Sequence, residues 1–406
     1  MTVENTDSKL YLYYQNQGIL PTYARFAGSE ELQKYQQLRA HLFLEKLCLP
    51  PKIFRGSRLV EFGPDSGENS LIFAKWGAEV TLVEPNPNAW MPISNYFEKF
   101  GLSNQLQTLA KVSLQDFETS DKFDFIDAEG FIYTIKPDVV WINLFSKILA
   151  ENGFLVLSYY ETFGCFLELI LKLINARAKS LTGLDSKEIA WKLFEAKWNS
   201  IPHTRSFESW VMDVLDNPYV RLKYLFNLAQ ILPALAEASF SLYSSWPIYS
   251  DSLSFYWHKK VLPPEQKLKS TLAHTARSCL SFAFGKKLFL CSESTDPVQL
   301  ANEVLINLLT VVDNSLDEFH PDILKVGSNS LAQIKNLIKG NAVLADAQQD
   351  KEDAIKLIES VQQIFNFLVE GDIDRLITFC NSDPAFISFW GLPCHFAVFK
   401  KGESST

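Results

Sequence analysis

Two glycines stand four residues apart in the stretch LVEFGPDSGENSL, which runs from Leu59 to Leu71. An apolar strand-like run ends at Gly63, and a helical pattern begins after Gly67. Glycine permits the tight turn and the close backbone approach that a ligand requires at the start of a helix. In open α/β sheets, such a turn after the first strand is typical of a site that binds a nucleotide or a nucleoside.

An acidic residue ends the next apolar run of the sequence. Glu84 closes AEVTLVE, twenty-one residues after Gly63, and is followed by Pro85. A carboxylate there can accept hydrogen bonds from both hydroxyl groups of a ribose. This offset fits either a dinucleotide site or a site for S-adenosylmethionine.

Two details of the turn separate these possibilities. Its pattern is E-x-G-x-D-x-G, which lacks the G-x-G-x-x-G spacing that accommodates a pyrophosphate. Glu61 would repel a pyrophosphate, whereas a carboxylate beside a cationic sulfonium is electrostatically favourable. The turn therefore favours S-adenosylmethionine, and a dinucleotide-dependent oxidoreductase is the weaker alternative.

Further polar residues follow the fourth and fifth strand-like runs. Asp127 and Glu129 end KFDFIDAEG, and Tyr159 and Glu161 end FLVLSYYE. Open α/β sheets keep their chemistry at the carboxyl ends of their strands, so these residues are candidates for the site. His203 lies in a polar break, SIPHTRSF, and is a candidate general base together with Glu161. The alternative roles are structural: carboxylates that cap the next segment, a tyrosine that packs, and a histidine without a chemical role.

The elements that must position these residues alternate between strand and helix. Strand patterns cover residues 58–62, 78–84, 105–110, 122–130 and 154–160, and helical patterns cover 68–77, 88–101 and 138–153. This order predicts an α/β fold with a Rossmann-like, doubly wound parallel sheet covered by helices on both faces. Two more strand-like runs, 239–245 and 252–260, are expected to form an antiparallel hairpin that completes a seven-stranded sheet.

The rest of the chain reads as mostly helical. Residues 1–55 are expected to form an N-terminal helical segment, and residues 56–262 the domain that holds the glycine turn. Within that domain, a helical insertion at 163–238 is expected to act as a lid over the acceptor pocket. Residues 263–406 are expected to form a mostly helical accessory domain, which ends in a strand-like run at 395–401 and could mediate formation of a homodimer.

Composition limits the function classes. The 406 residues are 47% hydrophobic and 21% charged, which is typical of a globular protein, and the formal net charge of −9 disfavours a nucleic-acid partner. The six cysteines include no CxxC pair, so neither a metal site nor a disulfide framework is expected. The sequence contains no signal peptide pattern and no run of eighteen or more uncharged apolar residues. We therefore expect a cytoplasmic protein without stable membrane insertion.

The ordered series LVEFGPDSGENSL, WGAEVTLVEPNP, KFDFIDAEGF and LAENGFLVLSYYE resembles the motifs of class I S-adenosylmethionine-dependent methyltransferases, with a bacterial subfamily as the nearest likeness. The resemblance covers roughly residues 35–260. It implies S-adenosyl-L-methionine as cofactor and contacts to it from one set of positions: Glu61, Gly63, Pro64, Asp65, Gly67, Asn69, Glu84, Pro85, Ser113, Asp127 and Glu129. The chain departs from the family pattern at Asp65, which replaces a glycine, and Ser113 or Asp116 stands where the family often binds the adenine amino group.

The function implied by the resemblance is transfer of a methyl group to a small-molecule acceptor, with a sugar or nucleotide-sugar hydroxyl as the preferred case. His203, Glu161 and Tyr159 are the candidate catalytic residues. Because the sulfonium is already activated, positioning can supply about 7–11 kcal/mol of the rate enhancement, so a missing base would not exclude an enzyme. The alternative is a catalytically inactive S-adenosylmethionine-binding scaffold or sensor.

Overall fold

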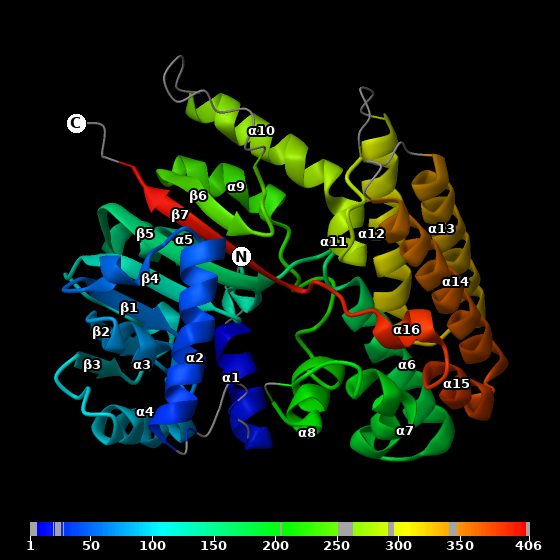
Figure 1. Cartoon of the computed structure of the whole chain (residues 1–406), viewed down its shortest axis with the longest axis horizontal. Helices are drawn as coiled ribbons and strands as arrows, with labels where there is room; N and C mark the ends of the chain where they lie inside the picture. The colour runs from blue at the N-terminus through cyan, green and yellow to red at the C-terminus, as the bar shows by residue number, and fades with distance from the viewer. Residues whose placement is uncertain are drawn as a thin grey trace. The chain divides into compact units, whose positions relative to one another are not determined.

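The computed structural model describes residues 6–18, 20, 26, 28–203, 205–250, 263–290, 296–340 and 347–402. The chain divides into two compact units, each built from separate stretches of sequence (Figure 1). The first unit comprises Met1–Tyr160, Phe226–Thr271 and Cys394–Thr406, and the second comprises Glu161–Leu225 and Leu272–Pro393.

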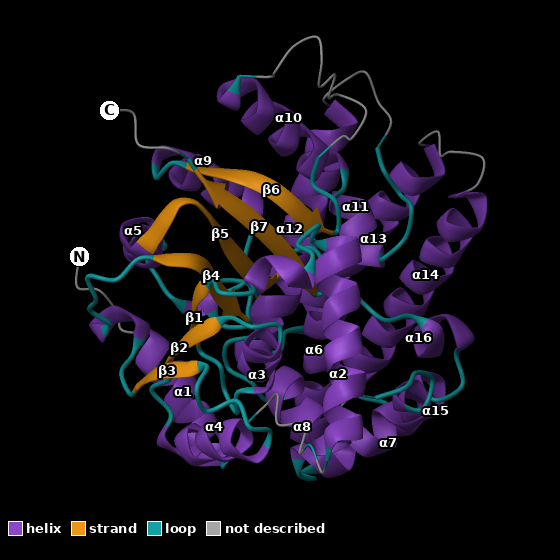
Figure 2. Ribbon diagram, turned by 60° about the vertical axis from the view of Figure 1, so that its left-hand side comes forward, coloured by secondary structure: helices purple, strands orange, loops and turns teal. Residues whose placement is uncertain are grey.

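The first unit contains a seven-stranded sheet in the order β3-β2-β1-β4-β5-β7-β6 (Figure 2). Strands β1 to β5 run parallel, and β7 is antiparallel to both β5 and β6. The strands are β1 Arg58–Phe62, β2 Glu79–Val83, β3 Leu106–Ala110, β4 Phe123–Glu129, β5 Leu149–Tyr160, β6 Phe240–Trp246 and β7 Cys394–Lys401. The predicted seven-stranded α/β sheet with an antiparallel end is therefore confirmed.

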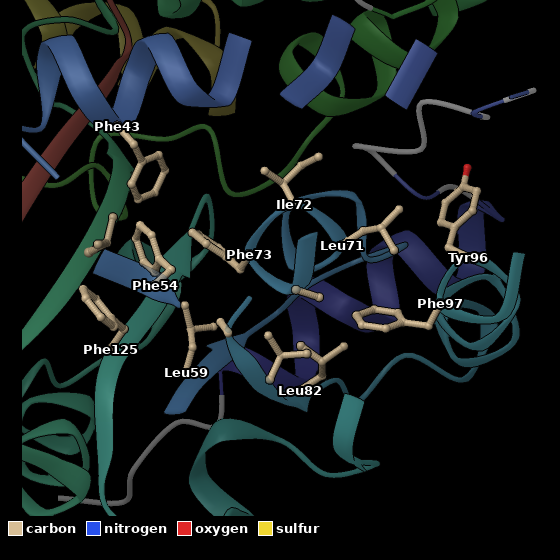
Figure 3. Packing of buried hydrophobic residues seen from close by; sticks show 14 of the residues in the cluster. Phe43, Phe54, Leu59, Leu71, Ile72, Phe73, Leu82, Tyr96, Phe97 and Phe125 are labelled. Atoms are coloured by element: carbon tan, nitrogen blue, oxygen red, sulfur yellow. The ribbon is translucent and has the colours of Figure 1, made fainter. Parts of the chain in front are cut away.

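Helices cover both faces of this sheet. On one face, the N-terminal helix α2 Ser29–His41, its π-helical continuation η1 Leu42–Lys46 and helix α3 Glu68–Lys75 meet aromatic side chains from the sheet. Figure 3 shows the rings of Phe43, Phe54, Phe73 and Phe125 turned toward one another, with neighbouring centroids 4.5–5.6 Å apart. Also in this unit are α1 Thr6–Gln17, the 3₁₀ turn η2 Pro51–Phe54, α4 Pro87–Lys99 and two further 3₁₀ turns, η3 Leu114–Asp116 and η4 Ile132–Thr134.

The other face of the sheet packs on α5 Val139–Ile148, and α9 Leu228–Glu237 packs beside α5 and β6. The ring of Phe62 lies 5.1 Å from that of Phe145, and Trp141 lies 6.4 Å from Phe226. Side chains alternate between the two faces of a strand. As a result, Phe62 points toward α5 while its neighbour Glu61 points toward the face that carries α2 and α3.

The elements of regular structure described in the second unit are all helices or helical turns. It contains α6 Phe166–Thr182, α7 Ser186–Trp198, α8 Phe207–Trp210, the π turn η5 Val211–Leu215, α11 Cys279–Phe284, α12 Asp296–Asp317, α13 Pro321–Gly340, α14 Gln348–Glu370, α15 Ile373–Cys380 and α16 Pro384–Ser388. Helix α10, Pro264–Arg277, belongs partly to each unit. No described helix has the length and apolar character needed to cross a lipid bilayer.

The antiparallel neighbour of β6 comes from a different part of the sequence than we expected. The sequence pattern suggested a hairpin between 239–245 and 252–260, but β6 pairs with β7, whose residues 394–401 were expected in the accessory domain. Residues 252–260 lie outside the described residues. The helix expected over 138–153 also ends early, at Ile148, because Leu149 already pairs with Phe123 of β4.

Candidate functional site

The glycine turn lies at the point where the order of the strands reverses. Strand β1 has β2 on one side and β4 on the other, so the loops after β1 and β4 leave the sheet in opposite directions. Ligands of open α/β sheets bind in the crevice that this reversal creates at the carboxyl ends of the strands. The predicted cofactor residues of β1, β2 and β4 all stand at that edge.

The backbone of the turn requires glycine at its first position. Gly63 has a φ of +65°, and a Cβ atom there would lie 2.9 Å from the ring of Phe131. The Gly63 amide donates a hydrogen bond to the Val83 carbonyl at 3.0 Å, which ties the turn to β2. Gly67, with a φ of +89°, begins α3, and Asp65 also adopts a left-handed conformation at +51°.

Glu84 points at the glycine turn. Its Oε2 atom accepts a hydrogen bond from the Asp65 amide at 3.1 Å, and its Oε1 atom accepts one from the Asn86 amide at 2.7 Å. The side chain is 4% exposed, so these bonds fix it in a nearly closed environment. Each carboxylate oxygen offers two lone pairs, which leaves capacity for further donors such as ribose hydroxyls.

Three more carboxylates gather on the face of the sheet that carries α2 and α3. Glu61 and Asp127 are direct neighbours across β1 and β4, and Glu129 follows Asp127 by two residues on the same face. Glu61 accepts a hydrogen bond from the Ser70 hydroxyl, and both Glu61 and Asp127 are buried. Beside them, Glu68 of α3 accepts a hydrogen bond from the Ser66 hydroxyl at 2.6 Å.

Burial and neighbouring carboxylates raise the pKa of both Glu61 and Asp127. The pKa of Glu61 is raised to about 8, mainly by burial and also by the charges of Glu129 and Glu68, while the Ser70 hydrogen bond and Arg39 oppose the rise. Burial also raises the pKa of Asp127, and Glu129 and Glu61 add to that shift. Neither Asp127 oxygen accepts a hydrogen bond from a described donor group. A cation bound here would favour the ionised forms.

Arg39 of α2 brings a positive charge to this group. Its guanidinium donates two hydrogen bonds to Glu129, at 2.9 and 2.7 Å, and lies 4.8 Å from the centre of the Phe43 ring. Arg39 was not among the residues predicted for the site. The sequence does contain a pattern that indicates its position. Leu32, Arg39 and Phe43 fall on one face of a helix, so Arg39 is expected to point into the core with the two apolar residues.

The other predicted cofactor residues fall around the same turn. Pro64 is buried, whereas Asp65, Asn69 and Pro85 are half-buried, and the Asn69 Oδ1 atom accepts a hydrogen bond from the Tyr35 hydroxyl of α2 at 2.6 Å. Ser113 follows β3 and donates from its hydroxyl to Asp116 at 2.7 Å. The two candidates for the adenine contact thus bind each other.

The three candidate catalytic residues are divided between the two units. Tyr159 lies fully buried on the face of the sheet that carries α5, with its ring 4.4 Å from Phe226 and its hydroxyl 3.1 Å from that of Tyr249. That face is opposite to the carboxylates. Glu161 and His203 belong to the second unit.

Their surroundings in that unit differ. Glu161 is buried and accepts a hydrogen bond from the Gly164 amide at 2.6 Å, and burial raises its pKa to about 8. His203 is exposed and stacks on Trp198, with ring centroids 3.6 Å apart. The catalytic roles of all three residues stay predictions.

Comparison with known proteins gives one family match and several distant structural likenesses. A family model described as a methyltransferase domain matches residues 32–244, a stretch that includes Arg39, the glycine turn, Glu84 and β4. A search of curated protein sequences found no match.

Among solved structures, the N-methyltransferase NodS from Bradyrhizobium japonicum, in complex with S-adenosyl-L-homocysteine, is 17% identical with a TM-score of 0.29, over 40% of this chain and 76% of that one. The glycopeptide N-methyltransferase MtfA, complexed with S-adenosyl-L-methionine, is 14% identical with a TM-score of 0.24 over 26% of this chain and 48% of MtfA. The [4+2]-cyclase SpnF is 10% identical with a TM-score of 0.39 over 99% of this chain and 98% of SpnF.

Likenesses this weak do not distinguish one acceptor from another, nor a methyltransferase from a cyclase. The family model is different, because its match spans more than half of the 406 residues and includes the glycine turn and the carboxyl ends of the parallel strands. The chain belongs to the methyltransferase domain family.

Proposed function

We propose that the protein binds S-adenosyl-L-methionine at the glycine turn and transfers its methyl group to a small-molecule acceptor. The observation that carries this proposal is the group of carboxylates at the carboxyl edge of the sheet, formed by the buried Glu61 and Asp127 and by Glu129, whose side chain is 12% exposed. In its ionised form such a group repels a phosphate and attracts a cation, and a bound cation favours that form. Membership of the methyltransferase domain family supports the same assignment.

The residues present fit the chemical groups of this cofactor. Glu84 has spare acceptor capacity for the ribose hydroxyls, and Asp127 has two buried oxygens without a described donor, which suits an ammonium group. Arg39 would meet the carboxylate of the amino-acid portion. Bound in this way, the cofactor supplies an activated methyl group for in-line displacement.

The protein's own contribution is mainly one of position. The turn at Gly63 and Gly67 allows backbone amides to approach the ligand, and Glu84 holds the turn against β2. Fixed geometry of this kind can supply about 7–11 kcal/mol of rate enhancement. A general base would add about 10²–10⁴-fold if the acceptor is a hydroxyl, and Glu161 and His203 remain the candidates for that role.

For the acceptor we propose a sugar or nucleotide-sugar hydroxyl. Support comes from the aromatic side chains of the second unit, where the rings of Trp191 and Phe207 lie 4.9 Å apart and Trp191 is 39% exposed. An exposed indole face suits the apolar face of a sugar ring. The function of residues 163–238 as a lid remains part of this proposal.

Calorimetric titration with S-adenosylmethionine, S-adenosylhomocysteine and NAD⁺ tests the proposed cofactor. We expect binding of the first two and none of NAD⁺. Glu84→Ala should weaken cofactor binding by about 1.5–3 kcal/mol, the range for hydrogen bonds to a charged group. The matched control is Glu79→Ala, at the exposed start of the same strand, which should leave the affinity unchanged. An unchanged dissociation constant in Glu84→Ala would refute the placement of the ribose.

Release of S-adenosylhomocysteine on incubation with acceptor pools tests methyl transfer itself. The alternative function, a scaffold or sensor that binds the cofactor without turnover, is favoured by Asp65, whose carboxylate replaces the family's glycine in the turn. Tight binding with no product from sugars, nucleotide sugars and other metabolite pools would support that alternative.

A further inference from the structure

A cavity of about 470 Å³ is lined by residues of the second unit alone, none of which was discussed for cofactor binding. It is bounded by the end of α11, the first half of α14 and the short helix α16. Small-molecule sites in proteins typically occupy about 300–1,000 Å³.

The floor of this cavity is apolar and aromatic. Phe284, Leu357 and Phe389 are each no more than 8% exposed, so they form part of the core beneath the cavity. Ile201, 38% exposed, and Trp390, half-buried, extend the apolar surface toward solvent. Binding sites for small ligands combine such an apolar lining with a few polar groups that fix orientation.

The charged lining groups are two lysines and one aspartate. Lys286 and Lys356 face a single lining carboxylate, Asp353. Lys286 donates a hydrogen bond to Asp353 at 3.0 Å and lies 3.8 Å from Asp350, which offsets its charge. Lys356 is exposed and lies near the same Asp353. With Asp350 counted, two lysines face two aspartates, and the charges balance. Lys286 is paired with both aspartates, whereas Lys356 forms no ion pair within 4 Å among the described residues.

The wall formed by α16 is held in place from below. The ammonium group of Lys197, which is fully buried, donates hydrogen bonds to the carbonyls of Phe386 (2.6 Å) and Phe389, and lies 4.7 Å from the Trp390 ring. Asp383 accepts hydrogen bonds at 2.7 Å from the Phe386 amide and from Ser360 of α14. A preformed wall lowers the entropic cost of binding, because few groups must be ordered.

We propose that this cavity binds a small aromatic carboxylate, with its ring against Trp390 and Phe389 and its carboxylate at Lys356. The apolar floor matches the ring, the exposed ammonium group of Lys356 matches one anionic group, and the volume suits a molecule of metabolite size. The proposal does not rest on the cofactor proposal, because none of the lining residues is among those assigned to the cofactor or to methyl transfer.

Calorimetric titration of the full-length protein with 2-naphthoate and with its neutral analogue 2-naphthamide tests this site. We expect 2-naphthoate to bind with the same affinity whether or not S-adenosylhomocysteine is present. Lys356→Glu should weaken binding of 2-naphthoate at least tenfold while changing that of 2-naphthamide less than threefold. Lys179→Glu, which reverses an exposed lysine of α6 outside the cavity, is the matched control and should leave both affinities unchanged.

A second pair of variants tests the location. Ser388→Trp, at an exposed position on the rim, and Ala385→Trp, deeper in the wall, should each abolish binding of both compounds while leaving the affinity for S-adenosylhomocysteine unchanged. Three results would overturn the proposal: no binding of 2-naphthoate to the folded protein, equal affinities in Lys356→Glu and wild type, or competition between 2-naphthoate and S-adenosylhomocysteine.

Discussion

Arg39 partly neutralises the negative charge of the carboxylate group beside the glycine turn. Its two hydrogen bonds to Glu129 neutralise one of several carboxylates that the sheet brings together, and its guanidinium is 7% exposed. Removing one partner of a buried ion pair leaves the other charge in an apolar environment without compensation.

We therefore predict that Arg39→Met lowers the free energy of unfolding by about 3–5 kcal/mol, as measured by urea denaturation. Arg58→Met is the control: this arginine is 45% exposed in its ion pair with Asp121, and its loss should cost about 1 kcal/mol or less. Equal losses in the two variants would show that the pair with Glu129 does not stabilise the fold.

From the raised pKa of Glu61 we predict that cofactor binding depends on pH. Its pKa in the ligand-free protein is raised to about 8, so near pH 7 it is mostly protonated, and a bound cation should drive it to ionise. Binding should then release a proton, and affinity should rise with pH between about 6 and 8, by up to about tenfold per unit for each proton released.

Calorimetry in phosphate and Tris buffers counts these protons, because the two buffers differ in ionisation enthalpy. Glu61→Gln should release fewer protons than wild type and show a flatter pH dependence. Identical proton counts in both proteins would assign the release to another group.

At the scale of elements, the turn after β1 combines backbone strain with a steric limit. Gly63 and Gly56 have similar φ angles, +65° and +72°, but a Cβ atom on Gly56 would meet nothing within 4 Å, whereas one on Gly63 would meet Phe131. Gly56→Ala should therefore cost about 1–2 kcal/mol for the left-handed conformation alone.

Gly63→Ala should cost more than Gly56→Ala in denaturant unfolding, and should also weaken cofactor binding. Adding Phe131→Ala to Gly63→Ala should recover the excess, because it removes the ring that the new methyl group meets. The effect of Gly63→Ala is therefore measured in two backgrounds, wild type and Phe131→Ala. If it lowers the free energy of unfolding equally in both, the contact with the ring is not the cause.

Local sequence patterns predicted where most strands lie in the chain, but they did not predict which strands pair at the antiparallel end of the sheet. The five parallel strands and the glycine turn follow from runs of apolar residues and from their punctuation by glycine. The run 395–401 also read as a strand, but its pairing with β5 and β6 joins segments that are far apart in the sequence. No short-range pattern specifies such a pairing.

The same limit applies to side chains in the site. The alternation of residues along β5 gives Tyr159 a face, but which face holds the carboxylates depends on the register between β4 and β5. Glu84 was predicted from its place at the end of β2, whereas its bonds to the Asp65 and Asn86 amides depend on how the turn closes.

At the scale of the whole molecule, β7 makes the sheet depend on a distant part of the chain. It lies between β5 and β6, so a fragment of residues 1–262 would lack an interior strand. We predict that this fragment fails to unfold cooperatively and does not bind S-adenosylhomocysteine, whereas a chain that ends after Gly402 does both. Circular dichroism during thermal unfolding and calorimetry measure these outcomes. A fragment 1–262 with wild-type behaviour would mean that β7 is dispensable.

The position of β7 also bears on biosynthesis. While a ribosome extends the chain from Tyr160 to Lys401, the edge of β5 awaits its neighbour, and at about 5–20 residues per second that interval lasts roughly ten seconds to a minute. Bare strand edges invite association between nascent chains. We expect chaperones that hold such edges to govern the yield of this protein in cells, more than the stability of the finished molecule does.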